Sequence, residues 1–213
     1  MKDKSQITDF NKDDVKIDRV ETCFNGFFKV NKYHFSHALY QGGYSNTLTR
    51  EVFERGDAVA VIPYDPVLDK IVFVEQFRIG AYRTDDAPWL LEFIAGMFGE
   101  QESPVEVAIR EAREEANLNL DKSFIEPVMK YLSSPGGTSE CIHLYVAKVD
   151  ASNVGGVYGL EHEGEDIKVL SFSLAQAMAY LAEGKISNAA TIIGLQWLAL
   201  NADNLKRRWQ TQQ

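Results

Sequence analysis

Residues 96–118 read GMFGEQESPVEVAIREAREEANL, and this stretch decides the fold. Its second half has the pattern of one amphipathic helix. Ser103 is a good N-cap, Pro104 suits the first helical position, and Glu106 completes a Ser-x-x-Glu capping box. Asn117 tolerates the left-handed conformation that ends many helices. At about 100° per residue, one face gathers the apolar side chains, which are Val105, Ala108, Ile109, Ala112 and Ala116. The stretch therefore predicts a helix from Pro104 to about Asn117 that packs against a sheet.

The same helix carries a dense acidic pattern. Glu111 and Glu115 are four residues apart, so they are stacked neighbours at the edge of the apolar face. Glu114 and Arg110 lie further round the helix. Two stacked carboxylates beside a core repel each other unless a cation joins them, and such oxygen ligands suit Mg²⁺ or Mn²⁺. Taken alone, a run of this kind is more often a solvated helix surface stabilised by ion pairs.

The composition limits the class of protein. A chain of 213 residues with 45% hydrophobic residues can bury one substantial core and carry a smaller appended domain. The net charge of −9 argues against nucleic-acid and membrane-surface partners, which reward basic patches. Cys23 and Cys141 form no CxxC motif, so we expect both to be small, buried, apolar residues. The lack of a disulfide pattern also predicts a reducing, cytoplasmic compartment. Neither a signal peptide nor a membrane-spanning stretch is expected.

Working outward, alternating residues from Val15 to Arg55 predict a small antiparallel sheet. Gly56 introduces two β-branched runs joined by the turn DPVLDK, which predict a hairpin over residues 58–78. The remaining predicted elements are strands at 124–132, 141–149 and 166–172 and helices at 173–185 and 188–209. The class is therefore α+β or a layered α/β/α arrangement, with an N-terminal domain over residues 1–55 and a second domain over 56–213.

The spacing of the acidic residues matches a known motif. Gly96 is followed after five residues by Glu102, and after seven more by Arg110-Glu111-Ala112-x-Glu114-Glu115-x-Asn117-Leu118. This order resembles the Nudix box of the nucleoside-diphosphate hydrolases, and average residue usage would produce it in roughly one chain per million of this length. Asn117 stands where the family has glycine. Asparagine reaches the left-handed region nearly as readily, so the departure leaves the chemistry untouched.

The resemblance extends to one branch of the family, the ADP-ribose pyrophosphatases. It covers WLLEFIAGMFGE before the box, SSPGGTSE after it, GLEHEGEDIKV and EGKISNAATIIGLQWL, and Pro135 follows the box at the spacing typical of the branch. The resemblance implies a Nudix α/β/α sandwich from about Gly56 onward, preceded by the small antiparallel β domain. It also implies Mg²⁺-dependent hydrolysis of the pyrophosphate bond of ADP-ribose to AMP and ribose 5-phosphate.

The resemblance assigns roles to the residues around the box. It implies that Mg²⁺, with Mn²⁺ as a substitute, is held by Glu111, Glu115 and the backbone carbonyl of Ala95. Supporting positions are Glu102, Glu114 and Arg110, the last of which orients glutamates through charge-assisted hydrogen bonds.

A general base is implied on the loop after the box, where the segment reads GLEHEGEDI. The matching residue is Glu163, with Glu165 as the contender. The alternative to a catalytic role is that this segment is a solvated acidic turn. The residues implied for substrate binding are Arg78, Arg50 and Glu51 for phosphate and adenine, Phe27 or Phe28 for the face of the base, and Ser134 and Glu140 for the terminal ribose.

The N-terminal sheet predicts an assembly. A three-stranded sheet of about forty residues is too small to be stable alone and must bury a face elsewhere. The branch resemblance implies a homodimer in which this sheet completes the nucleotide site of the partner, with Arg50 and Glu51 acting across the interface.

Two other classes of function stay open. One is a Nudix-fold binding module without catalysis, against which the intact set of carboxylates argues. The other is a different substrate: GDP-mannose or another nucleotide sugar, a dinucleoside polyphosphate, or capped RNA, the last being disfavoured by the acidic chain.

Overall fold

The computed structural model describes residues 7, 9–83, 87–99 and 101–211. It divides into two compact units. The first contains the residues up to Arg55 together with Ser134–Glu140, and the second contains Gly56–Ser133 and the chain from Cys141 onward. A short internal segment, residues 134–140, thus belongs to the unit otherwise built from the N-terminal residues.

The first unit is a three-stranded antiparallel sheet in the order β1-β2-β3, as the alternating pattern predicts. Its strands are β1 (Val15–Asn25), β2 (Lys29–His37) and β3 (Leu48–Glu54). The internal segment joins it through Phe53, whose amide donates to the carbonyl of Gly137 (2.9 Å) and whose carbonyl accepts from Ser139 (3.2 Å). Large apolar side chains stay exposed on this unit, among them Ile17 (52%), Val20 (46%) and Phe24 (60%).

The second unit contains an eight-stranded mixed sheet with a main order of β10-β11-β5-β4-β9-β8, where β6 pairs with β5 and β7 with β4. Only β4 and β9 are parallel among its described pairs. The strands are β4 (Asp57–Asp65), β5 (Lys70–Phe77), β6 (Trp89–Glu92), β7 (Ile94–Phe98), β8 (Ile125–Leu132), β9 (Cys141–Lys148), β10 (Gly156–Tyr158) and β11 (Ile167–Ser173).

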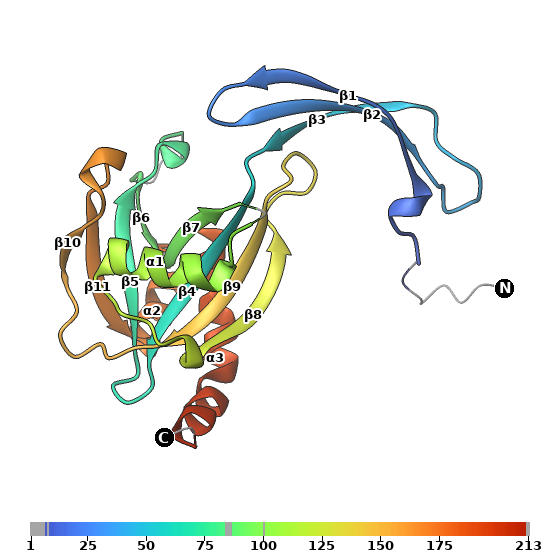
Figure 1. Ribbon diagram of the computed structural model, residues 1–213. Coiled ribbons are helices and arrows are strands. Elements are labelled where there is room, and N and C mark those ends of the chain that lie inside the picture. The colour runs from blue at the N-terminus through green and yellow to red at the C-terminus, as the bar shows by residue number, and fades with distance from the viewer. Residues whose placement is uncertain (1–6, 8, 84–86, 100, 212–213) are drawn as a thin grey trace. The chain divides into compact units, whose positions relative to one another are not determined.

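Helices cover both faces of this sheet (Figure 1), α1 (Pro104–Ala116) on one and α2 (Leu174–Ala182) with α3 (Ala189–Gln210) on the other. The side chains of strand β4 explain why both faces of the sheet need a helical cover. Val59 and Val61 pack with the α1 core, whereas Ala60 and Ile62 pack with the α3 core, so alternate residues of one strand serve two apolar clusters. A strand buried on both faces reads as a continuous apolar run. The predicted α/β/α sandwich with a separate small antiparallel sheet is confirmed.

The ends of α1 agree only in part with the sequence prediction. Asn117 adopts the left-handed conformation (φ 52°), and the amide of Leu118 donates to the carbonyl of Ala112 (2.9 Å). The predicted capping box is wrong, because the side chain of Ser103 makes no capping hydrogen bond. Val107, absent from the predicted apolar face, is buried.

The cysteines are not the buried pair that we expected: Cys23 is exposed and Cys141 is half-buried, and both are free thiols. Among the described helices none is long and apolar enough to cross a membrane.

Candidate active site

The site begins where β7 passes the side of α1. Glu115 is only 2% exposed, and its Oε2 accepts a hydrogen bond from the amide of Ala95 (3.1 Å). The next residue, Gly96, lies directly against Glu111: a Cβ built on Gly96 would overlap the Glu111 side chain. The absence of a side chain at Gly96 therefore allows two carboxylates of α1 to reach the strand side by side, which is what the four-residue spacing predicts.

Arg110 holds two of the glutamates together. Its Nη2 lies 2.9 Å from Oε1 of Glu111, and its Nη1 donates to Oε2 of Glu114, also at 2.9 Å. A planar guanidinium suits this forked contact. Glu102 lies two residues before the helix, and its carboxylate accepts a hydrogen bond from the amide of Gly99 (2.9 Å).

The two central carboxylates are strongly perturbed. Burial raises the pKa of Glu115 to about 8, and repulsion from Glu111 adds to the effect, opposed by the Ala95 amide and by Arg78. Burial likewise raises the pKa of Glu111 to about 7, with Arg110 opposing and with Glu114 and Glu165 adding to the rise. Buried carboxylates that repel one another are stabilised as anions by a nearby cation. The donor set is oxygen only, and it therefore fits a hard divalent metal ion.

The acidic loop lies over the same helix. The amide of Gly159 donates to the backbone carbonyl of Glu114 (3.2 Å), which ties the loop to α1. Gly159 has φ +107°, and a Cβ there would overlap Glu165, so glycine is required. The carboxylate of Glu165 accepts from the amide of Leu160 (3.0 Å). Its charge contributes to the raised pKa values of both Glu111 and Glu115.

Glu163 is placed differently from Glu165. It ends the short 3₁₀ turn η4 (Glu161–Glu163), and its side chain is 57% exposed. Its Oε1 lies 3.8 Å from Nε2 of His162, whose side chain is 76% exposed. The side chain is therefore available to solvent, whereas that of Glu165 is turned back toward its own loop.

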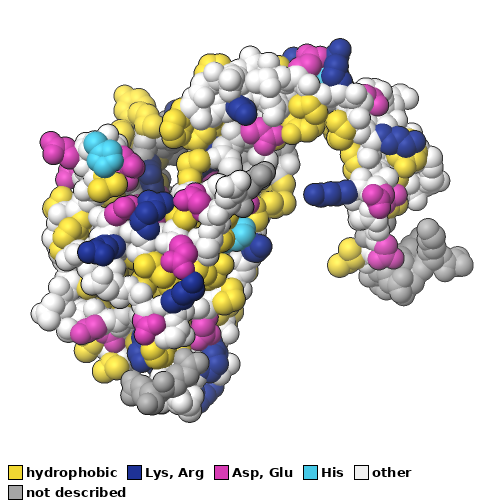
Figure 2. Space-filling view, in the orientation of Figure 1, with side chains coloured by type: hydrophobic (Ala, Val, Ile, Leu, Met, Phe, Trp, Pro, Cys, Tyr) yellow, Lys and Arg dark blue, Asp and Glu magenta, His cyan; other side chains and the backbone are white. Residues whose placement is uncertain are grey.

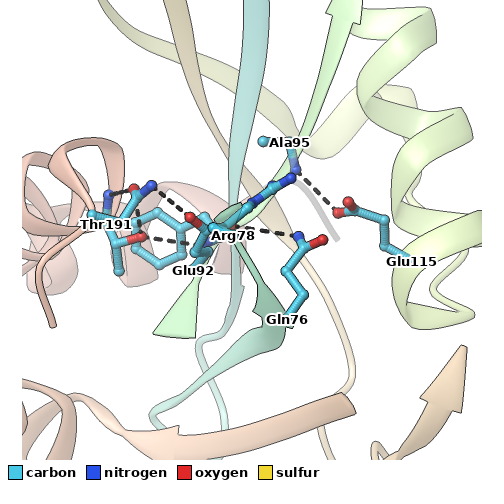
Figure 3. A network of polar contacts seen from close by, with 8 residues as sticks. Gln76, Arg78, Glu92, Ala95, Glu115 and Thr191 are labelled. Carbon is cyan, nitrogen blue, oxygen red and sulfur yellow. Dashed lines mark hydrogen bonds and ion pairs between the residues drawn. The ribbon is translucent and has the colours of Figure 1, made fainter. Parts of the chain in front are cut away.

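A polar network lies beside the carboxylates (Figure 3). Nε of Arg78 donates to Oε2 of Glu92 (2.9 Å), and Asn188 at the start of α3 donates to Oε1 of the same carboxylate (2.8 Å). Gln76 makes a longer contact with Glu92 at 3.4 Å. The guanidinium of Arg78 extends from this network toward Ala95, and its charge lowers the pKa of Glu115. The network thus orients the predicted phosphate-binding arginine.

Glu92 was not among the residues predicted for the site. It is 4% exposed and is the last residue of β6, which Phe93 separates from β7. The available signal was a single acidic residue inside the apolar run WLLEFIAG, since buried charges are almost always paired.

The remaining predicted residues belong to the first unit. Phe27 is 90% exposed and meets Phe28 edge to face at 4.7 Å. Arg50 donates to the carbonyl of Thr49, and Glu51 lies 3.4 Å from Lys32. The carbonyl of Ser134 accepts the amides that close the turn of the internal segment. Glu140 is 7% exposed and pairs with Arg55 at 2.9 Å.

The surface over α1 carries both signs of charge. Figure 2 shows acidic and basic side chains interspersed on the face of the second unit that α1 covers. A mixed surface of this kind differs from the continuous basic stripe typical of nucleic-acid-binding proteins.

An α/β/α sandwich whose helical carboxylates lie against a glycine of the neighbouring strand is typical of metal-dependent hydrolases that act on phosphates. Comparison with known proteins supports this class. The family model described as NUDIX domain matches residues 54–192. The chain belongs to this family.

Individual members of the family are similar to this chain over most of its length. The chain is 48% identical to an ADP-ribose pyrophosphatase of Escherichia coli strain K12, over 94% of this chain and 95% of the relative. It is 42% identical to an ADP-ribose pyrophosphatase of Haemophilus influenzae, over 98% and 97%. A GDP-mannose pyrophosphatase of Yersinia enterocolitica is 31% identical, over 88% and 97%. A crystal structure of an ADP compounds hydrolase shares the fold, with a TM-score of 0.66 at 21% identity, over 89% of this chain and 95% of that one.

Proposed function

We propose that the chain is a hydrolase that cleaves the pyrophosphate bond of ADP-ribose to give AMP and ribose 5-phosphate. The observation that carries the proposal is the 48% identity, over 94% of the chain, with an enzyme named ADP-ribose pyrophosphatase. The buried carboxylate pair supports the reaction class, because cleavage of a doubly negative pyrophosphate needs concentrated positive charge at the site.

The metal ion of the proposal is Mg²⁺, with Mn²⁺ as a substitute. Glu111, Glu115 and the carbonyl of Ala95 would hold it, supported by Arg110 and Glu114. When bound, a divalent cation neutralises phosphate charge and lowers the pKa of a coordinated water. Burial raises the pKa of both glutamates, and repulsion between carboxylates adds to the rise. A bound cation would favour their charged forms and so oppose both effects.

Glu163 is our proposed general base. The chemical need is for a carboxylate that is not engaged by metal and can accept a proton from the attacking water. Glu163 is exposed at the turn of a loop tied to α1 through Gly159. Glu165 is the contender, and its charge contributes to the raised pKa of Glu111 and Glu115. Loop closure over bound substrate would bring Glu163 to the water.

Arg78 is proposed to bind a substrate phosphate. Its side chain is 43% exposed while its partner carboxylate, Glu92, is 5% exposed. Among the described residues, Glu92 accepts from Nε of this arginine and so orients it, which leaves the terminal guanidinium nitrogens for an anion.

A homodimer completes the proposal. The exposed apolar side chains of the first unit, including Val20 and Phe27, need a covering surface. A second copy of the chain would cover them and contribute Phe27, Arg50 and Glu51 to the nucleotide site of its partner. Ser134 and Glu140 are proposed near the terminal ribose, where Glu140 would act with its ion-pair partner Arg55.

The decisive experiment is a substrate panel. The purified full chain is given ADP-ribose, GDP-mannose or a dinucleoside polyphosphate with Mg²⁺, and the nucleoside monophosphate released is quantified. We expect the highest kcat/KM with ADP-ribose, and products AMP and ribose 5-phosphate. A clear preference for GDP-mannose would overturn the substrate, and binding of ADP-ribose without turnover would favour the non-catalytic module.

A further inference from the structure

Three chemically distinct side chains gather in the second unit apart from the proposed catalytic carboxylates. A ring nitrogen of His143, the Sγ of Cys141 and a carboxylate oxygen of Asp57 all lie within 4.8 Å of one another. Oδ2 of Asp57 is 3.9 Å from Nε2 of His143. Nitrogen, sulfur and oxygen donors in one place differ from the oxygen-only set on α1.

The sheet positions this cluster. Strands β4 and β9 are parallel, with Ala58 opposite Ile142 and Val59 opposite His143. Cys141 and His143 are two residues apart on β9, so both point to one face. Asp57 lies at the start of β4, and its Oδ1 accepts from the amide of Cys141 (3.2 Å), which leaves Oδ2 directed at the histidine.

The imidazole is held in place by packing. The side chain of His143 is 11% exposed, and its ring meets that of Phe98 edge to face, with centroids 5.0 Å apart. Asp57 is opposite Phe98 in the pairing of β4 with β7. A ligand whose ring is already oriented loses little freedom when it binds a metal. The cluster is also open on one side, since the Asp57 side chain is 42% exposed.

We infer that Asp57, Cys141 and His143 form a binding site for one transition-metal ion of the Zn²⁺ type, separate from the magnesium site. Tetrahedral Zn²⁺ takes thiolate, imidazole and carboxylate ligands at about 2.3, 2.0 and 2.1 Å, so its ligand atoms lie about 3.4–3.6 Å apart. The present separations, all within 4.8 Å, would have to shorten to these values by side-chain rotation when the ion binds. A water completes the tetrahedron on the open side, and metal binding releases the thiol proton of Cys141 to solvent.

One charge opposes the site. Lys130 on β8 is opposite His143 in the β8–β9 pairing, and its charge lowers the pKa of both His143 and Cys141. It nevertheless repels a dication more strongly than the single thiol proton that the dication replaces. Asp57 offsets this charge within the cluster. We therefore expect Lys130→Met to tighten metal binding, a response that a cluster with a purely structural role would not give.

Cobalt spectroscopy on the full chain tests the inference. Chelator-stripped protein is titrated with Co²⁺, and the thiolate-to-cobalt charge-transfer absorption in the near ultraviolet is recorded. Cobalt bound by the α1 carboxylates gives no such band, because those ligands contain no sulfur. With excess Mg²⁺ present to occupy the α1 carboxylates, we expect the band to saturate at one Co²⁺ per chain and to disappear when Zn²⁺ displaces cobalt.

Variants assign the ligands. The chain has two cysteines, so Cys23→Ser is the matched control and should keep the band, while Cys141→Ser should lose it. His143→Gln and Asp57→Asn should weaken Co²⁺ binding. If Cys141→Ser fails to fold, retention of the band in Cys23→Ser still assigns the thiolate to Cys141. Absence of the band from the native chain, or its loss in Cys23→Ser, would overturn the inference.

Thiol reactivity gives a second readout. Zn²⁺ should protect Cys141 from alkylation and leave the exposed Cys23 reactive. At a free Zn²⁺ concentration ten times the Kd, only about a tenth of the sites are empty, so modification of Cys141 should slow ~10-fold. Equal rates with and without Zn²⁺ would count against the site.

Discussion

The amide of Ala95 donates a hydrogen bond to Oε2 of Glu115 across 3.1 Å and thereby joins β7 to α1. Beside this bond, Glu111 fills the space that Gly96 leaves. The strand therefore fixes both carboxylates of the proposed metal site, one through a hydrogen bond and the other through close packing. Changes on either side of this contact should affect catalysis before they affect the fold.

Glu115→Gln should lower kcat by ~10²-fold or more, because the loss of a charged metal ligand removes several kcal/mol of transition-state stabilisation. The amide oxygen of glutamine can still accept from Ala95, so the fold should survive. Steady-state kinetics at saturating Mg²⁺ measures kcat, and circular dichroism tests whether the fold is retained. Glu106→Gln, at an exposed position of the same helix, is the control and should be near neutral. Near-normal turnover of Glu115→Gln would remove this residue from the metal site.

Gly96→Ala should impair the site by sterics alone. The added Cβ overlaps the side chain of Glu111, which must move or push the strand away, at about 1–3 kcal/mol. We expect a weaker apparent affinity for Mg²⁺ and a lower unfolding midpoint. Gly80→Ala is the matched control, since a Cβ at Gly80 meets no atom within 4 Å. Equal Mg²⁺ titrations for the two variants would contradict the packing argument.

Glu163→Gln should lower kcat by about 10²–10⁴-fold, the usual contribution of a general base, with KM and Mg²⁺ affinity largely unchanged. The same change at Glu165 tests the contender, and Glu161→Gln on the same turn is the control. A larger kcat loss at Glu165 would exchange the two roles. If neither variant loses activity, the base lies outside this loop.

The metal-free chain should lose stability as pH rises through neutrality. Glu115 titrates near 8 in the folded chain against an ordinary value of 4.5, so folding favours its protonated form. The associated stability is fully present below about pH 4.5 and is lost between there and about pH 8, because the unfolded chain ionises first. Thermal unfolding in chelator at pH 5 and pH 8 should show a steeper decline for the native chain than for Glu115→Gln. Parallel declines would refute the assignment.

The stabilisation of the fold by Mg²⁺ should increase with pH, in contrast to the stability of the metal-free chain. Binding requires deprotonated carboxylates, and burial holds the pKa of Glu111 near 7 and that of Glu115 near 8. The rise in unfolding temperature on adding Mg²⁺ should therefore be larger at pH 8 than at pH 5.

A mixture of two inactive variants should test the proposed dimer. If Glu51 acts across the interface and Glu115 acts within its own chain, then Glu51→Gln and Glu115→Gln are each impaired, but a heterodimer contains one fully native site. Co-refolding the two should restore activity, and sedimentation should report a dimer. A monomer with full activity, or a mixture no more active than its components, would exclude the arrangement.

Local patterns predicted much of this fold. The period of α1, its left-handed end at Asn117 and the i,i+4 carboxylates depend on neighbouring residues, and so do the alternating strands. Strands β6 and β7 were not predicted, because WLLEFIAGMF is a nearly continuous apolar run whose division at Phe93 is set by pairing with β5 and β4.

The rest of the site depends on distant residues. The contact of Glu92 with Arg78 and Asn188 joins positions up to 96 residues apart, and no local spacing encodes it. The same holds for Asp57 with Cys141, 84 residues apart. Here the fold brings together side chains that sequence periodicity leaves unrelated.

The membership of residues 134–140 in the first unit changes how the two units can be separated. The chain passes between them at 55/56, 133/134 and 140/141. A single cut near Arg55 would therefore release all three strands of the sheet but leave Gly137 and Ser139 without their bonds to Phe53. The N-terminal sheet is thus not a removable module. Grafting it onto another catalytic domain would require transplanting the internal loop as well, so the two segments are expected to be inherited together.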